Sequence, residues 1–130
     1  MKVTKGSCLC GNITYLIEGP LRSVSACHCN QCRKSTGHYV ASTQCMTSDL
    51  NINGDSLVWF KSSLTAERGF CSTCGSNLFW SEFESNKTSI WAGTIDGPTG
   101  LKMTNQIHSE SKGDYYELPD IPTIEQTQLR

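Results

Sequence analysis

The stretch Cys27-His28-Cys29-Asn30-Gln31-Cys32-Arg33-Lys34 places three cysteines in a C-x-C-x-x-C pattern and follows them with two cations. Two closely spaced cysteine pairs flank it along the chain: Cys8 with Cys10, and Cys71 with Cys74. Closely spaced thiols of this kind are typical of metal sites. We call Cys27, Cys29 and Cys32 the central triplet, and the four flanking cysteines the outer cluster.

Eight cysteines in 130 residues point to either disulfides or metal. The segment before the first cysteine carries charge but no apolar run, so it does not resemble a secretory signal. No stretch approaches the roughly 20 apolar residues of a membrane helix. We therefore expect a cytoplasmic protein without a membrane partner. In a reducing compartment closely spaced cysteines more often hold zinc than form disulfides.

The charge balance argues against nucleic acid as a partner. Formal net charge is −1, from 11 basic and 12 acidic residues that are intermixed along the chain. Binding to nucleic acid generally requires a strongly basic face. A small anionic ligand held by a few local cations is compatible with this composition. The sequence gives no indication of an oligomeric state.

The chain length and its pattern of short strands and turns predict a single all-β domain over residues 1–130. Short runs rich in β-branched and aromatic residues alternate with Gly, Pro and Asn turn signals, and no long amphipathic helix is present. One short helical turn is expected after Cys29, ending near Gly37. The proline-containing last 30 residues predict a loop, a brief edge strand and a loose tail. The clearest strands are predicted at 12–18, 24–27, 39–43, 57–61 and 88–92.

The outer cluster is interpreted as a structural zinc site. Gly11 and Gly75 directly follow the two pairs and permit the left-handed backbone that closes a zinc knuckle. Four thiolates fill a tetrahedral zinc and leave no position for substrate. Closing the intervening loop of 60 residues costs about 4 kcal/mol in chain entropy. A structural zinc contributes an apparent 10–16 kcal/mol or so, which exceeds that cost.

The central triplet admits two interpretations. Three protein ligands with a free fourth position are typical of a catalytic zinc, and a thiol ligand suits such a sulfur-rich site. Arg33 and Lys34 could then receive carboxylates of that ligand. Alternatively, Cys45 supplies a fourth thiolate and the site is closed. His28 is expected to face away from its cysteine neighbours, because adjacent strand residues point to opposite faces.

The remaining candidates are single residues. Arg68 is interpreted as a solvated cation, while His28 is either a proton shuttle or a histidine outside the ligand set. His38 and His108 are interpreted as structural. The aromatic residues are predicted to lie in the core or at its rim, with one of them lining a pocket: Trp59, Phe60, Phe79, Trp80 and Trp91.

Five motifs together resemble the glutathione-dependent formaldehyde-activating enzyme family, which includes centromere protein V-like domains. In order along the chain they are 6–15, 27–37, 60–63, 68–78 and 92–96. The resemblance implies a β-tent fold of folded antiparallel sheets with zinc knuckles. It also implies two zinc ions per chain: a structural zinc on the outer cluster and a catalytic-type zinc on the central triplet. Cys45 is not one of the family ligands, which implies a free buried thiol.

The resemblance further implies a zinc-dependent carbon–sulfur lyase acting on a glutathione or small-thiol adduct, in the manner of S-hydroxymethylglutathione synthase. The alternative is a non-catalytic zinc-binding module for protein interaction. One position departs from the family pattern, because this chain carries Gln106 near where members often carry a histidine.

Overall fold

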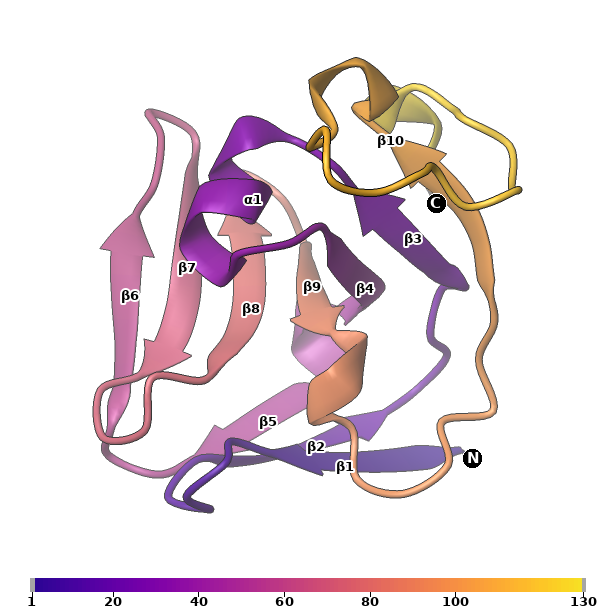
Figure 1. Ribbon diagram of the computed structural model, residues 1–130. Coiled ribbons are helices and arrows are strands. Elements are labelled where there is room, and N and C mark those ends of the chain that lie inside the picture. Colours follow the sequence, from indigo (N-terminus) through magenta and orange to yellow (C-terminus); the bar gives the residue numbers. More distant parts are fainter. Residues whose placement is uncertain (1, 130) are drawn as a thin grey trace.

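Within residues 2–129, which the computed structural model describes, the chain forms two β-sheets and one α-helix (Figure 1). The smaller sheet is antiparallel and has the order β1 (Val3–Ser7), β2 (Thr14–Glu18), β5 (Leu50–Asn53). Seven strands make the larger sheet. Their order is β10 (Met103–Ile107), β3 (Val24–Cys27), β4 (Val40–Met46), β9 (Lys87–Trp91), β8 (Asn77–Glu82), β7 (Ala66–Cys71) and β6 (Leu57–Lys61).

The two sheets face each other like the sides of a tent, and we call the seven-stranded sheet the large panel and the three-stranded sheet the small panel. This arrangement confirms the predicted all-β fold. The chain passes from the large panel to the small one through the 3-10 turn Thr47–Asp49, between β4 and β5. All pairings in the large sheet are antiparallel except that of β10 with β3. The hydrophobic core lies between the panels and contains Ile13, Tyr15, Ile17, Cys45, Cys71, Leu78, Phe79 and Ile90.

Strand alternation gives the large sheet a second, concave face that points away from this core. On β4, Thr43 and Cys45 are buried on the core side, and Val40, Ser42 and Gln44 line a cavity on the other side. The same alternation continues on the neighbouring strands, because successive side chains of a strand point to opposite faces. The central triplet lies at one end of this face.

The helix α1 (Asn30–Thr36) confirms the predicted helical turn. The Cys29 sulfur caps its start by accepting from the Cys32 backbone N–H at 3.3 Å, and Gly37 ends it with a φ of 84°. Sulfur at the cap satisfies one of the free amides of the first turn. In the described part of the chain, no helix has the length and apolar character needed to cross a membrane.

Two segments differ from expectation. The sequence does not predict strand β1, because its inward positions are Thr4 and Gly6 and offer no apolar alternation. Strand β6 forms as predicted and lies at the sheet edge, so Trp59 (36% exposed) and Phe60 (60% exposed) are at the rim and outside the core, within the range of the prediction. The segment after β10 is not a loose tail, since it returns to pair with Gln106 through a parallel bridge to Thr123.

Candidate metal centres and cavity

The central triplet is brought together where β3 runs into α1. Cys27 ends the strand, Cys29 caps the helix, and Cys32 lies in the first helical turn. Their sulfurs all lie within 4.8 Å of one another, and those of Cys29 and Cys32 are 3.1 Å apart. The edge of a tetrahedron with metal–sulfur bonds of about 2.3 Å is about 3.8 Å. The three sulfurs therefore fit one zinc ion after Cys29 and Cys32 separate by less than about 1 Å.

No fourth cysteine, histidine or carboxylate within residues 2–129 joins this group. Cys45 points to the opposite side of the large sheet, where it is 3% exposed in the core. The alternative in which Cys45 closes the site is therefore wrong. The expectation that Cys45 is a free, buried thiol is confirmed.

The cysteines of the central triplet differ in the direction in which their surroundings shift the thiol pKa. Hydrogen bonds from Cys27 and then Cys32 lower the pKa of Cys29, and the nearby Arg68 guanidinium acts in the same direction. Hydrogen bonds to Cys29 and Cys32, together with burial, raise the pKa of Cys27. The arrangement thus stabilises a thiolate at Cys29, which is the form that a metal ligand must take.

Arg68 is a buried partner of the triplet, and its interpretation as a solvated cation is wrong. It is 8% exposed, and its Nη2 donates to Cys32 Sγ at 3.7 Å and to Gln31 Oε1 at 3.3 Å. The alternation of β7 places it on the concave face, where its guanidinium also lies over the Trp91 ring at 5.8 Å. No carboxylate of the described residues lies within 4.0 Å of it.

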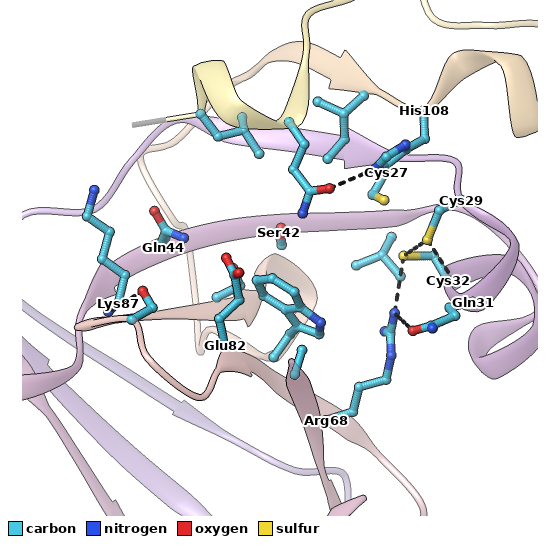
Figure 2. Close-up of a pocket in the computed structure, with 18 of the residues that line it drawn as sticks. Cys27, Cys29, Gln31, Cys32, Ser42, Gln44, Arg68, Glu82, Lys87 and His108 are labelled. Carbon is cyan, nitrogen blue, oxygen red and sulfur yellow. Dashed lines mark hydrogen bonds between the residues drawn. The ribbon is translucent and has the colours of Figure 1, made fainter. Parts of the chain in front are cut away.

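The triplet opens into a cavity of about 990 Å³ on the concave face. Its floor is formed by alternate residues of β4, β9, β8 and β7, including Trp80 and Trp91, so aromatic residues line a pocket as predicted. His108 also lines the cavity, along with Gln126, Thr127 and Leu129 near the C-terminus. Figure 2 shows the cysteines and Lys87 at opposite ends of this elongated space.

Cations that line the cavity are not the ones predicted from sequence. Arg33 and Lys34 are absent from its walls, since α1 turns Arg33 toward Asn30 Oδ1 (2.9 Å) and leaves Lys34 exposed. Their assignment as carboxylate binders has no support from the cavity. Three other cations line it instead: Arg68, Arg22 and Lys87.

Arg22 is held at the cavity wall by the backbone of β4. Its Nη2 donates to the Ser42 carbonyl at 3.2 Å, and burial lowers the pKa of its guanidinium. Within the described residues no carboxylate lies within 4.0 Å of Arg22 or Lys87, and the cavity wall contains a single carboxylate, that of Glu82. The cavity is therefore suited to an anionic ligand.

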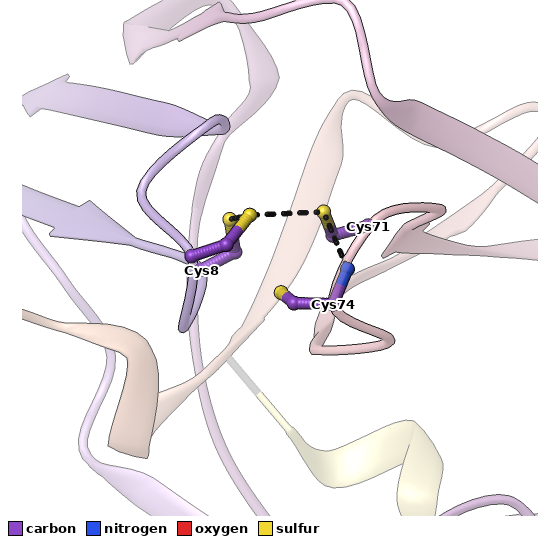
Figure 3. A group of neighbouring side chains, drawn as sticks. Cys8, Cys71 and Cys74 are labelled. Atoms are coloured by element: carbon purple, nitrogen blue, oxygen red, sulfur yellow. Dashed lines mark hydrogen bonds between the residues drawn. The ribbon is translucent and has the colours of Figure 1, made fainter.

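The outer cluster has the geometry of a closed zinc site. Its four sulfurs lie within 4.8 Å of one another (Figure 3). The Cys8–Cys10 sulfur distance is 3.6 Å and the Cys10–Cys71 distance is 3.8 Å, against the tetrahedral edge of about 3.8 Å. One knuckle joins β1 to β2 and the other joins β7 to β8, so an ion here would cross-link the two panels.

Hydroxyl groups favour the thiolate form in the outer cluster. Ser76 Oγ lies 3.2 Å from Cys74 Sγ, and this hydrogen bond is the main cause that lowers the pKa of Cys74 to about 5. Ser56 Oγ lies 3.2 Å from Cys71 Sγ and lowers the pKa of that thiol in the same way. Thiolates at these positions match the requirement of zinc for deprotonated ligands.

His28 faces away from the triplet, as predicted. It is fully buried, with Nδ1 2.6 Å from the Tyr116 hydroxyl and Nε2 2.9 Å from Gln106 Oε1. It does not line the cavity, which leaves the proton-shuttle interpretation without support. His38 packs against Tyr39 and the Tyr115–Tyr116 pair, in agreement with a structural role.

The comparisons with known proteins agree with this geometry. The chain is 28% identical over 116 residues to an uncharacterized lyase of Schizosaccharomyces pombe, covering 87% of this chain and 83% of the relative. Its fold is similar to a crystal structure of a Rhodobacter sphaeroides protein, with a TM-score of 0.60 and 23% identity over 77% of this chain and 99% of that one. Residues 3–111 match the family model described as glutathione-dependent formaldehyde-activating enzyme. The chain therefore belongs to the glutathione-dependent formaldehyde-activating enzyme family.

Proposed function

We propose that this protein is a zinc-dependent carbon–sulfur lyase that joins formaldehyde to glutathione, or to a related small thiol, and cleaves the same adduct in reverse. The observation that supports it best is a three-cysteine site that opens into a cavity lined by cations without carboxylate partners. Family membership and the lyase name of the yeast relative support the reaction class.

The residues present fit two zinc ions per chain. The outer cluster would hold one and the central triplet the other. A zinc ion on the triplet would supply a Lewis acid with one free coordination position, which is the general feature of catalytic zinc sites. Arg68 compensates the excess negative charge of three thiolates by donating to Cys32 Sγ.

The cavity dimensions suit glutathione near the triplet. Cys27 pairs with Val40, and Ser42, which accepts from Arg22, lies two residues further along β4, or about 7 Å. A tripeptide with its thiol at the triplet spans at most about 11 Å, so its carboxylates can reach Arg68 and Arg22. Lys87 pairs with Met46, about 20 Å from the level of Cys27, and lies outside that reach.

The proposed reaction requires mainly that the thiol and the aldehyde be held next to each other. In the forward direction the sulfur forms a bond to the carbonyl carbon of formaldehyde, and the thiol proton is transferred to the oxygen. In reverse the carbon–sulfur bond breaks, the hydroxyl proton returns to the sulfur, and formaldehyde and the free thiol leave. The chain's contribution is to bind the thiol through its carboxylates and to align it with the aldehyde, for which proximity supplies the main gain.

The test is adduct formation from formaldehyde and glutathione, followed by NMR, with the uncatalysed rate subtracted. We expect an excess rate in the zinc-loaded protein and none in Cys29→Ser, which should bind one metal ion fewer. Arg68→Gln should raise KM for glutathione at least tenfold. The matched control Arg33→Gln removes a neighbouring cation that does not line the cavity and should leave KM unchanged. Absence of any excess rate in the wild type would refute the proposed activity.

One observation favours the alternative of a zinc-binding module for protein contact. Apolar side chains are exposed along and beside the edge strand β6, where Val58 is 40%, Phe60 60% and Phe83 48% exposed. A protein that binds two metal ions but shows no excess rate with any small thiol would support this alternative.

A further inference from the structure

The match to the family model ends at residue 111, but the chain beyond it contacts residues that surround the candidate metal site. We call residues 112–129 the C-terminal strap. Tyr116 of the strap bonds to His28, which lies between two cysteines of the central triplet, across 88 residues of sequence. Further along, Gln126 and Leu129 help to line the cavity. In Figure 1 the strap returns beside β10 and β3.

Gln106 forms hydrogen bonds both with the C-terminal strap and with His28, the residue between Cys27 and Cys29. Its Nε2 donates to the Pro119 carbonyl at 3.1 Å and to the Ile121 carbonyl at 3.0 Å. Because both partners can only accept, the orientation of the amide is determined. Its Oε1 therefore faces His28, where it accepts from Nε2 at 2.9 Å. Gln106 is 2% exposed, and its side-chain amide has a partner at both ends.

This orientation also determines the tautomer of His28. Since Nε2 donates to Gln106, the neutral ring has a lone pair at Nδ1, which accepts from the Tyr116 hydroxyl at 2.6 Å. The His28 backbone N–H donates to the Ile107 carbonyl at 3.1 Å. The ring is fully buried, so every polar group that could orient it is engaged. The backbone between Cys27 and Cys29 is held from both the ring and the main chain.

We propose that Tyr116, His28 and Gln106 are positioning residues through which the C-terminal strap holds Cys27 and Cys29 in metal-binding geometry. The three residues touch neither the cavity nor the triplet sulfurs, so they act through the backbone that carries the ligands. The proposal rests on metal binding by the triplet and not on lyase activity. Groups hydrogen-bonded directly to metal ligands typically change metal affinity 10–100-fold when removed, and we expect an effect at the lower end of that range here, because these residues act through the backbone.

Gln106 is suited to this junction where a histidine is not. The position needs two donors for the strap carbonyls and one acceptor for His28. A neutral histidine offers one donor and one acceptor, so it would leave one of the three partners unsatisfied.

The test uses two tyrosines that are adjacent in sequence. Tyr116→Phe keeps the ring that stacks on His28 but removes the hydroxyl that donates to it. Tyr115→Phe is the matched control, because its hydroxyl contacts the exposed His38 and the Gly37 carbonyl instead. Zinc affinities of both sites are measured by chelator competition, and the cobalt-substituted protein gives the thiolate charge-transfer spectrum. Gln106→His is a second variant that retains a polar side chain.

We expect Tyr116→Phe and Gln106→His to weaken zinc binding at the central triplet about tenfold or more and to shift the cobalt spectrum of that site. Zinc binding at the outer cluster should be unchanged in both variants, and Tyr115→Phe should match the wild type at both sites. Unchanged affinity and spectrum in Tyr116→Phe would overturn the proposal. So would an equal loss at both metal sites, which would indicate general destabilisation. None of these readouts depends on the reaction, so a failure here is distinguishable from a failure of the proposed lyase activity.

Discussion

Replacing Cys10 by serine tests whether a metal ion cross-links the two panels. Cys10 is the best ligand to change because its side chain is exposed. Cys71 is fully buried, so its replacement by serine would also bury a hydroxyl group in the core and destabilise the fold independently of the metal. The effect of Cys10→Ser should therefore come from the metal alone. The two knuckles are separated by 60 residues, and a zinc ion that joins them contributes an apparent 10–16 kcal/mol or so against a closure cost of about 4 kcal/mol, so its loss should lower the free energy of unfolding by at least about 4 kcal/mol.

For a chain of 130 residues, a loss of at least about 4 kcal/mol corresponds to a fall in Tm of at least about 15 °C. Metal content by atomic emission and Tm by calorimetry are measured on the same samples, before and after chelation. We expect Cys10→Ser to retain one ion instead of two. Leu9→Ser is the control, because it changes an exposed neighbour in the same knuckle (87% exposed) without removing a sulfur. A variant with two ions and a wild-type Tm would refute the cross-link.

Three further outcomes follow from the core. Cys45→Ala should retain both metal ions, and in the wild type the Cys45 thiol should resist alkylation, because burial raises its pKa to about 11. Burial raises the pKa of Tyr15 to about 12, so the unfolded chain loses this proton near pH 10 and the folded chain only near pH 12. The free energy of unfolding should fall across that window by up to about 3 kcal/mol, and urea titrations of Tyr15→Phe should lack this component. Gly6→Ala would place a Cβ in steric conflict with the Tyr15 ring and should lower the free energy of unfolding by about 1–3 kcal/mol, measured by calorimetry.

The elements predicted correctly are those whose determinants are local. The central triplet and α1 lie within ten residues, and the cap at Cys29 and the glycine at position 37 bound the helix in sequence as they do in the structure. Each pair of the outer cluster is likewise local. That the two pairs meet was an inference from zinc chemistry, and the sulfur distances agree with it.

The cavity cations could not be predicted, because their positions depend on strand register and on the face of a helix. Arg33 follows the triplet directly in sequence, but the next residue of a helix is rotated by about 100° from the last. Arg68 is distant in sequence, yet β7 brings it within 3.7 Å of Cys32 Sγ. Lys87 and Arg22 join it only because β9 and the segment before β3 flank β4.

The sequence predicts a loose tail where the structure has the C-terminal strap, because the strap is held by polar contacts and not by an apolar pattern. Its apolar runs are short, so a hydrophobic pattern gives it no place in a core. The structure holds it instead by polar bonds to Gln106 and His28, which are invisible to any local pattern because they join residues 13 to 88 positions apart. Such bonds are strong only where water is excluded, and both partners are nearly or fully buried. A segment that is polar in composition can therefore be as well ordered as the core, provided that its polar groups form hydrogen bonds with buried side chains.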